Sequence, residues 1–164
     1  MRQKTLLVVR HAKSCWLDDS LDDIDRPLNP RGIANAPEMG QRLLQRKHVP
    51  DRIISSAAVR AFATAAAIAA KLDYPKDDIF VADNLYHGSK DDVLGVIEAL
   101  SEEIHTVMIV LHNPTITELA NHAAAEEIDN VPTCGVLLIE AATWAGFRED
   151  GTLIDFDYPK RPQE

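Results

Sequence analysis

The feature that most constrains the fold of this chain is an apolar, β-branched run near its N-terminus that stops at two polar residues. The run from Thr5 to Val9 is typical of a buried strand, and Arg10 and His11 follow it directly. In open α/β sheets, ligands bind beyond the carboxyl ends of the strands. An arginine beside a histidine at that place indicates an anion clamp next to a nucleophile or a proton carrier. The alternative is a strand followed by two solvent-facing polar residues.

Strand and helix signals alternate along the rest of the chain. Strands separated by helices favour a mostly parallel sheet covered on both faces. The sequence therefore predicts one domain over residues 1–164, with an α/β fold and a three-layer α/β/α sandwich around a mostly parallel central sheet. The expected strands are Thr5–Val9, Arg52–Ser55, Ile79–Ala82, Thr106–Leu111, Thr133–Glu140 and Thr152–Asp157, and the expected helices are Pro30–Lys47, Ala57–Leu72, Ser89–Leu100 and Pro114–Ala124.

The segments between and beyond these elements are polar. Residues 13–29 are predicted to form a long loop whose aspartates are solvated, or alternatively tune access to a site or pair with Arg26. Trp16 is expected to anchor this loop onto the body of the protein. The tail from Asp157 to Pro162 is expected to run into a loose terminus. The apolar face of the first helix is predicted to consist of Ile33, Ala36, Met39, Leu43 and Leu44.

Composition and charge exclude several classes of function. The formal net charge of −9 disfavours non-specific binding to nucleic acid or to an anionic membrane. The apolar stretch before Arg10 is too short for a signal peptide or a membrane span. Cys15 and Cys134 have no metal-binding spacing, so reduced thiols in a cytoplasmic protein are expected. A protein this acidic needs a local basic pocket if it is to bind phosphate.

The succession of a strand end, a polar group and a helix start occurs three times. The first occurrence gives Arg10 and His11, the second places Arg60 in the first turn of a helix, and the third gives His112. Because the carboxyl ends of neighbouring parallel strands meet at one edge of a sheet, two guanidiniums and two imidazoles should surround one cavity. Helix N-termini there favour anions. Arginine suits bidentate recognition of phosphate, and a neutral histidine is a competent nucleophile towards phosphorus.

In these strand-end residues and their flanking motifs, the sequence resembles the histidine phosphatase superfamily, and within it the small phosphohistidine phosphatases of the SixA type. Three motifs in the right order carry the resemblance, which extends over essentially the whole chain. They are Arg10-His11-Ala12 with Lys13-Ser14, the element from Ser55 to Ala65 that contains Arg60 and Thr64, and Leu111-His112-Asn113-Pro114. The segments Asp25-Arg26-Pro27-Leu28, Arg31-Gly32 and Tyr158-Pro159 also fit the family.

The resemblance implies a phosphoglycerate mutase-like fold and a role for each motif residue. His11 would attack the phosphoryl group and become a phosphohistidine, while Arg10, Arg60 and His112 would bind the phosphate oxygens and stabilise the transition state. Water would then release inorganic phosphate, with no metal and no cofactor. Further candidate substrate contacts are Lys13, Arg26 and His87. The implied partner is a protein phosphorylated on histidine or a small phosphorylated metabolite.

Two departures from the family pattern favour phosphohistidine as the substrate. Related mutases and broad-specificity phosphatases carry a carboxylate as general acid, but Asn84 to Ser89 contains no glutamate and Asn113 stands where the phytase branch has an aspartate. An alkyl phosphate needs such an acid to protonate its leaving oxygen, whereas a phosphoramidate whose ring nitrogen is protonated does not. There is also no room for a large lid insertion between Leu72 and Ser89.

Two alternatives remain open at this stage. The protein could be a small-metabolite phosphatase of the same family, or a non-catalytic module that binds a phosphorylated ligand in the same cavity. Other phosphate-handling classes fit poorly. Leu21 and Glu140 stand where a cysteine phosphatase based on Cys15 or Cys134 needs an arginine. There is no P-loop and no Gly-x-Gly after the first strand. Asp155-Phe156-Asp157 lies too late in the chain for a haloacid-dehalogenase-type phosphatase.

Overall fold

The computed structural model describes residues 3–163; Met1 and Arg2, on which the leader-peptide prediction partly depends, lie outside the described residues. A six-stranded sheet has the order β3-β2-β4-β1-β5-β6. Its strands are β1 Lys4–Arg10, β2 Arg52–Ser55, β3 Phe80–Val81, β4 Thr106–Leu111, β5 Val136–Ala141 and β6 Thr152–Asp157. Three of the five strand pairs are parallel, and β5 is antiparallel to both β1 and β6.

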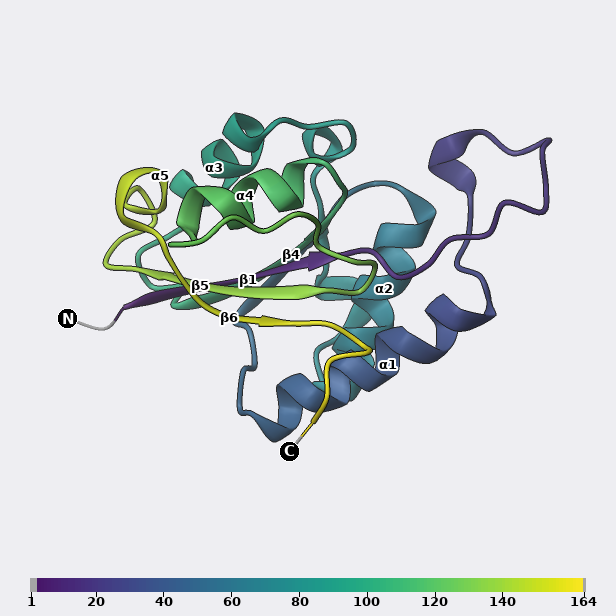
Figure 1. Ribbon diagram of the computed structural model, residues 1–164, viewed down its shortest axis with the longest axis horizontal. Coiled ribbons are helices and arrows are strands. Elements are labelled where there is room, and N and C mark those ends of the chain that lie inside the picture. Colours follow the sequence, from purple (N-terminus) through teal and green to yellow (C-terminus); the bar gives the residue numbers. More distant parts are fainter. Residues whose placement is uncertain (1–2, 164) are drawn as a thin grey trace.

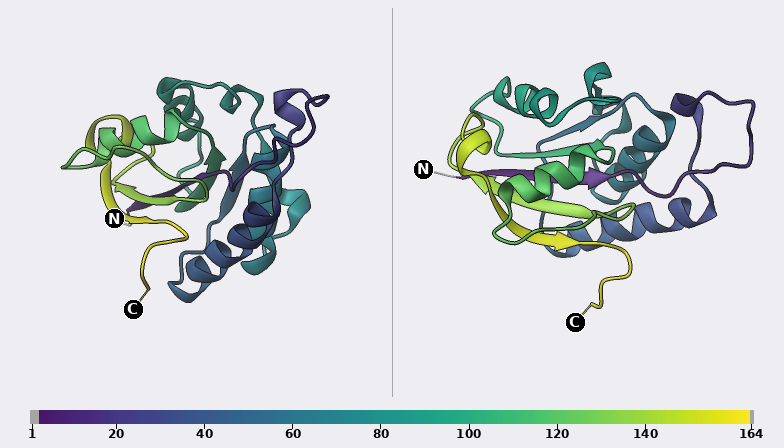
Figure 2. Two further views of the ribbon diagram at one scale, coloured as in Figure 1. Left: turned by 45° about the vertical axis from the view of Figure 1, so that its right-hand side comes forward. Right: turned by 45° about the horizontal axis from the view of Figure 1, so that its top comes forward.

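Helices cover both faces of this sheet. They are α1 Pro30–Gln45, α2 Val59–Lys71, α3 Lys90–Glu98, α4 Thr115–Ala123 and α5 Phe147–Asp150. In Figure 1, α1 and α2 lie below the sheet and α3, α4 and α5 lie above it, and Figure 2 shows the same three layers from two other directions. The predicted α/β/α sandwich is therefore confirmed. The short helix α5, which follows the turn after β5, has no counterpart among the predicted elements.

Period-two alternation along β1 builds the two halves of the core. Leu6 and Val8 belong to the apolar cluster between the sheet and the helices α3, α4 and α5. Leu7 and Val9 belong to the cluster between the sheet and the helices α1 and α2. Because successive strand side chains point to opposite faces, a continuous apolar run is the pattern that a strand covered on both faces requires. Burial of this run positions the strand end, and with it Arg10 and His11.

The predicted apolar face of α1 is correct in part. Ala36, Met39 and Leu43 are buried, but Ile33 and Leu44 are exposed. The buried stripe instead continues through Gly32 and Gly40, residues three or four positions from the buried apolar ones, which keeps the stripe on one side of the helix. Ile33 and Leu44 are each one position away from a stripe residue, and a step of one residue turns the side chain by about 100°.

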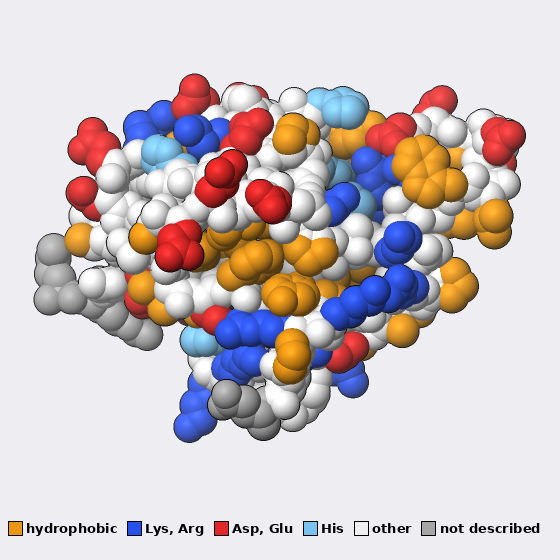
Figure 3. All heavy atoms as spheres, in the orientation of Figure 1, with side chains coloured by type: hydrophobic (Ala, Val, Ile, Leu, Met, Phe, Trp, Pro, Cys, Tyr) orange, Lys and Arg blue, Asp and Glu red, His pale blue; other side chains and the backbone are white. Residues whose placement is uncertain are grey.

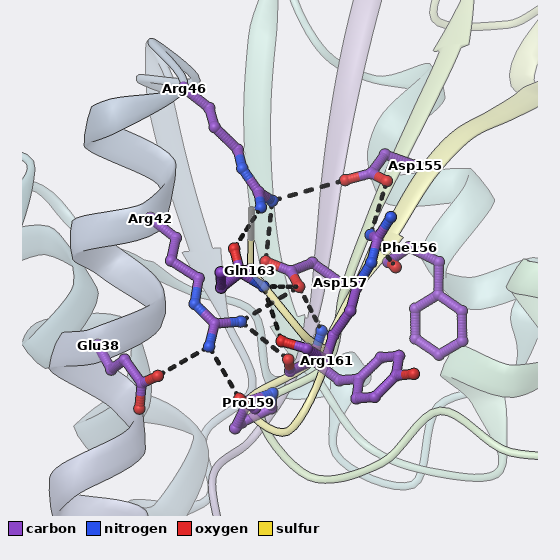
Figure 4. A network of polar contacts seen from close by, with 10 residues as sticks. Glu38, Arg42, Arg46, Asp155, Phe156, Asp157, Pro159, Arg161 and Gln163 are labelled. Atoms are coloured by element: carbon purple, nitrogen blue, oxygen red, sulfur yellow. Dashed lines mark hydrogen bonds and ion pairs between the residues drawn. The ribbon is translucent and has the colours of Figure 1, made fainter.

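The chain end after β6 is held by a polar network rather than loose (Figure 4). Arg42 on α1 donates to Asp157 and to the carbonyl oxygens of Tyr158 and Pro159 at distances between 2.8 and 3.2 Å. Arg46 donates to the other oxygen of Asp157 at 2.9 Å. A buried arginine from α1 therefore ties the last described residues to the body of the protein.

Candidate active site

The three motif segments meet because β2, β4 and β1 are neighbours in the sheet. Backbone hydrogen bonds continue the parallel ladder past the strand ends: His11 N–H donates to the carbonyl oxygen of Leu111, and Ser56 N–H donates to that of Val110, both at 3.0 Å. The residues that follow β1, β2 and β4 are therefore aligned side by side. This places His11, Arg60 and His112 at one edge of the sheet, as the strand ends predicted.

His11 is held as a neutral imidazole with one nitrogen available. The residue is only 7% exposed. Its Nδ1 lies 2.7 Å from the carbonyl oxygen of Ala12, which can only accept, so Nδ1 carries the proton. Burial lowers the pKa of His11 to about 4, and the charges of Arg60 and Arg10 act in the same direction. Within the described part of the chain, Nε2 has no hydrogen-bond partner, so it presents a lone pair at neutral pH.

The orientation of His11 depends on the start of α2. The N–H of Ala12 donates to the hydroxyl of Thr64 at 2.9 Å, and that hydroxyl donates to the carbonyl oxygen of Arg60 at 2.8 Å. Both Ala12 and Thr64 are fully buried. The carbonyl group that holds His11 Nδ1 is therefore part of a peptide segment fixed against α2.

His112 lies beside His11, with the ring centroids 5.1 Å apart. Its Nε2 is 2.7 Å from the hydroxyl of Ser56. Burial is the main reason that the pKa of His112 falls to about 3, and the neighbouring His11 and Arg60 add to the effect. His112 is therefore a neutral ring at physiological pH. The Ser56 hydroxyl already accepts from Ala58 N–H at 3.3 Å, which leaves its own proton for Nε2 of His112. In the tautomer in which Ser56 donates to Nε2, the proton of His112 lies on Nδ1, where it can be donated to an anion.

Three buried donor atoms of the site have no hydrogen-bond partner among the described residues. They are Nε of Arg10, Nε of Arg60 and Nδ1 of His112. The Nη1 of Arg10 is used structurally, since it donates to the carbonyl oxygen of Val131 at 3.0 Å. Leaving a buried donor unpaired costs about 1–3 kcal/mol. A bound oxyanion that accepts from all three donors would remove this cost, so the cluster has the properties of an anion site.

Asp23 and Tyr86 are site residues that the sequence did not single out. Asp23 lies in a 3-10 turn of the loop after β1 and receives hydrogen bonds from Arg60, Arg26 and Tyr86. The expectation of a merely solvated acidic loop is wrong at this position, and the alternative of pairing with Arg26 is confirmed. The only sequence signal was the short spacing between Asp23 and Arg26; nothing local indicated that Tyr86, 63 residues away, would approach.

The site opens into a groove of about 360 Å³ beside Arg60 and His112. Tyr86, His87 and Glu118 also line it. Figure 3 shows basic and histidine side chains gathered in a hollow between the projecting loop after β1 and the rest of the molecule. His87 lines the groove, with its ring centroid 4.0 Å from that of Tyr86, and it stays a candidate substrate contact.

The other two candidate contacts lie in different surroundings. Arg26 is buried, donates to Ser14 at 2.8 Å and contributes to the positive charge that lowers the pKa of His11. Lys13 is exposed and lines a separate groove of about 420 Å³ together with Arg31 and Lys160. The structure therefore places Arg26 beside the anion site formed by Arg10, Arg60 and His112, and it leaves Lys13 outside this site.

Trp16 does not anchor the loop onto the body, contrary to expectation. Its side chain is 72% exposed, and the guanidinium of Arg26 stacks over its ring at 3.4 Å from the centroid. The loop is held instead by backbone pairing at its base, where Cys15 N–H donates to Pro27 and Asn29 N–H donates to Lys13. An arginine that is already hydrogen-bonded offers the indole a planar cation to stack on, so the ring remains outside the core.

Within residues 3–163, two carboxyl groups lie at the site or its groove: Asp23, which is bound by Arg60, Arg26 and Tyr86, and Glu118, which is exposed on the groove. The hydrogen bond from Tyr86, followed by those from Arg60 and Arg26, holds the pKa of Asp23 far below its usual range. Asp23 is therefore ionised and cannot donate a proton. Asp83, which directly precedes the segment from Asn84 to Ser89, is exposed. Among the same residues, no three His, Cys, Asp or Glu side chains are arranged to hold a metal ion.

Comparison with known proteins places the chain in a family. Residues 6–84 match the histidine phosphatase superfamily (branch 1). An uncharacterised protein of Mycobacterium leprae is 33% identical over 170 residues, which cover 93% of this chain and all of that protein.

Solved structures give the same result over nearly the full length. A structure from Nakamurella multipartitia has a TM-score of 0.84 and 25% identity, with 98% of each chain covered. One from Agrobacterium tumefaciens has a TM-score of 0.83 and 28% identity, with 97% of this chain and all of the other covered. Both proteins were provisionally assigned as SixA phosphohistidine phosphatases.

The chain therefore belongs to the histidine phosphatase superfamily. Within the superfamily it is of the SixA type, because its sheet and its helices on both faces agree with those structures along almost the entire chain. The segment that matches the family model contains Arg10, His11 and Arg60 but ends before His112. The sheet order brings His112 to the other three, since β4 lies between β2 and β1.

Proposed function

We propose that the protein is a phosphohistidine phosphatase that works through a phosphohistidine intermediate on His11. The observation that carries the proposal is the state of this ring: buried, neutral, with Nδ1 hydrogen-bonded to a carbonyl oxygen and Nε2 unpaired. A neutral imidazole with a directed lone pair is a nucleophile ready for attack on phosphorus. The unpaired donors of Arg10, Arg60 and His112 supply the electrostatic stabilisation that phosphoryl transfer needs.

In the first step, a bond forms between His11 Nε2 and phosphorus while the bond from phosphorus to the substrate nitrogen breaks. A substrate imidazole that carries a proton on its other nitrogen leaves as neutral imidazole and takes up no further proton. His11 becomes a phosphorylated imidazolium, and its Nδ1–H remains hydrogen-bonded to Ala12. In the second step, water attacks phosphorus, the bond to Nε2 breaks, and the products are dihydrogen phosphate and neutral His11.

The ionised state of Asp23, the carboxylate bound to Arg60, supports phosphohistidine over an alkyl phosphate as the substrate. Asp23 is ionised and bound by two arginines, so it does not protonate a leaving oxygen. General acid catalysis contributes about 10²–10⁴-fold to such reactions, so its loss penalises alkyl phosphates selectively. The proposed substrate is thus a protein phosphorylated on histidine, in a reaction without metal or cofactor. The cytoplasmic location remains a prediction; no helix in residues 3–163 is long and apolar enough to cross a membrane.

The test compares hydrolysis of a phosphohistidine-bearing phosphocarrier protein with that of sugar phosphates and p-nitrophenyl phosphate, in buffer that contains EDTA. We expect preferential turnover of phosphohistidine, its loss in His11→Ala, and its retention in His48→Ala, a histidine remote from the site. Acid-labile phosphate should be trapped on His11 at short times. Preference for an alkyl phosphate would identify a metabolite phosphatase, and phosphate binding without any turnover would identify a binding module.

A further inference from the structure

We propose that Asp23 is a positioning residue for phosphoryl transfer: it holds the guanidinium of Arg60 so that Nε of Arg60 faces the phosphate. This inference deepens the proposed function and rests on it. Asp23 binds Arg60 at two points. Nη1 donates to the backbone carbonyl oxygen of Asp23 at 2.6 Å, and Nη2 donates to its carboxylate oxygen Oδ2 at 3.0 Å. Both terminal nitrogens of Arg60 are therefore directed towards one residue.

This anchoring determines what Arg60 can offer to a ligand. The guanidinium is a rigid planar group, so fixing both Nη atoms also fixes the direction of Nε. Nε of Arg60 is buried and has no hydrogen-bond partner among the described residues, like Nε of Arg10 and Nδ1 of His112. The side chain of Arg60 is almost fully buried, whereas that of Asp23 is 44% exposed. Asp23, a partly exposed residue of the loop after β1, thus fixes the orientation of the buried guanidinium of Arg60.

Two further donors hold the Asp23 carboxylate itself in place. Nε of Arg26 donates to Oδ1 at 3.0 Å, and the hydroxyl of Tyr86 donates to Oδ2 at 2.6 Å. The ring of Tyr86 also lies near His112, with centroids 5.7 Å apart. Asp23 therefore connects the loop after β1, the first turn of α2 and the segment before α3, and these are the segments that surround the anion site.

The carboxylate is not needed to close the loop on which it lies. Backbone hydrogen bonds from Cys15 to Pro27 at 2.8 Å and from Asn29 to Lys13 at 2.9 Å join the two ends of the loop, and an antiparallel bridge pairs Ser14 with Leu28. Removal of the Asp23 side chain should therefore leave the fold intact. It removes the partner of Arg60 Nη2 and the partner shared with Arg26 and Tyr86, so that Arg60 keeps only the bond from Nη1 to the backbone carbonyl oxygen. This separates a positioning role from a merely structural one.

The experiment measures kcat and KM for a phosphohistidine-bearing protein with Asp23→Ala, Asp23→Asn and the control Asp22→Ala. Asp22 is a neighbouring aspartate whose side chain makes no capping hydrogen bond. We expect kcat to fall at least 10-fold in Asp23→Ala with KM changed less than threefold, because loss of alignment acts on the transition state. Asparagine keeps an acceptor oxygen, so Asp23→Asn should recover part of the loss. Asp22→Ala should match the wild type.

Several outcomes would overturn the proposal. A kcat for Asp23→Ala within twofold of wild type would do so, as would an equal loss in Asp22→Ala. If Asp23 acted only as a negative charge that weakens phosphate binding, its removal would lower KM and leave kcat unchanged or higher. A fall in kcat therefore distinguishes positioning from electrostatic competition.

A readout independent of turnover separates this proposal from the proposed function. The Nε–H of Arg60 gives an NMR signal that should be sharp and slow to exchange in the wild type and broadened in Asp23→Ala. Wild-type protein that hydrolyses no phosphohistidine would refute the proposed function, while a preserved signal difference would still show that Asp23 orders Arg60. Active wild-type protein with identical Arg60 signals in both forms would refute the positioning role alone.

Discussion

His11 is buried and His112 is half-buried, both rings are neutral, and different groups hold them. A backbone carbonyl oxygen accepts from Nδ1 of His11, whereas a serine hydroxyl lies at Nε2 of His112. A carbonyl oxygen only accepts and a hydroxyl can donate, so the two rings can carry their proton in ways that give them opposite roles towards a ligand. His11 offers a lone pair at Nε2, and His112 offers a proton at Nδ1 in the tautomer in which Ser56 donates to its Nε2. At the scale of single residues, the division of roles comes from these hydrogen-bond partners.

The burial of His11 should be visible in the pH dependence of stability. In the unfolded chain His11 takes up a proton near pH 6.5, whereas the folded pKa is about 4. Between these values the unfolded state binds more protons, so stability falls as the pH falls, by about 2 kcal/mol at pH 5. Urea unfolding at pH 7, 6 and 5 would show a weaker pH dependence for His11→Gln than for wild type. Equal slopes in the two proteins would contradict the assignment.

The orientation of His112 should depend on Ser56. We expect Ser56→Ala to lower kcat about 10-fold, at the upper end of the roughly 0.5–1.5 kcal/mol of one hydrogen bond, because Nε2 of His112 loses the partner that fixes the tautomer of the ring. Ser55→Ala is the matched control, since the buried hydroxyl of Ser55 donates to a backbone carbonyl oxygen instead. Steady-state kinetics of both variants would decide the point, and equal losses would refute a specific role for Ser56.

At the scale of elements, the N-terminus of α1 packs directly on the segment that carries the nucleophile. The Asn29 side chain caps α1 by accepting from Gly32 N–H at 2.9 Å, and the same turn contacts the backbone of Lys13, two residues after His11. A Cβ at position 32 would lie 2.3 Å from the carbonyl oxygen of Lys13. Gly32 is therefore required by the close approach of two backbones.

Gly32→Ala should consequently destabilise the protein and reduce its activity. Overpacking against backbone that cannot move aside costs about 1–3 kcal/mol, and the displaced segment carries His11. Gly95 on α3 is the matched control because nothing lies within 4 Å of its added Cβ. Gly95→Ala should stabilise by roughly 0.5–1 kcal/mol through helix propensity. Thermal and urea unfolding would test both signs, and a Gly32→Ala protein as stable as wild type would contradict the packing argument.

At the scale of the whole molecule, contacts between distant parts of the chain hold both the site and the chain end. The loop after β1 reaches α2 through Asp23 and Arg60, and the residues after β6 return to α1 through Arg42 and Asp157. The second pair is almost fully buried on both sides. A buried charge that loses its partner is costly, so this network contributes to the order of the tail.

Arg42→Met should therefore loosen the tail and destabilise the fold by roughly 3 kcal/mol, the low end for breaking a buried ion pair, because Arg46 still binds Asp157. Arg161→Met removes a more exposed pair with Asp155 and should cost less than about 1 kcal/mol. Urea unfolding and limited proteolysis of the C-terminal segment would compare the two. Similar behaviour of both variants would rule out the buried network as the main support of the tail.

Sequence-based prediction succeeded where a feature depends on neighbouring residues in the chain and failed where it depends on contacts between distant residues. The β2 bounds Arg52–Ser55 and the β4 bounds Thr106–Leu111 were predicted to the residue, because apolar, β-branched runs between polar residues are local signals. Arg60 falls in the first turn of α2, as predicted. The exposure of Trp16, the contacts of Asp23 with Arg60 and Tyr86, and the ordered tail were missed. Each depends on a partner 10 to 117 residues away, and no local pattern encodes that meeting.

Local sequence patterns were sufficient to identify the residues that could carry the chemistry: strand ends that terminate in Arg10-His11 and in His112, and a helix that begins around Arg60. Side-chain periodicity and the positions of polar residues after apolar runs are properties of the chain alone. The electrostatic state and the neighbours of these residues, by contrast, depend on how the whole chain folds. Burial lowered the pKa of both histidines, and the sheet order set their rings 5.1 Å apart. Desolvation and long-range contacts exist only once the chain has folded, and for that reason the place of Asp23 at the site could be recognised only from the structure.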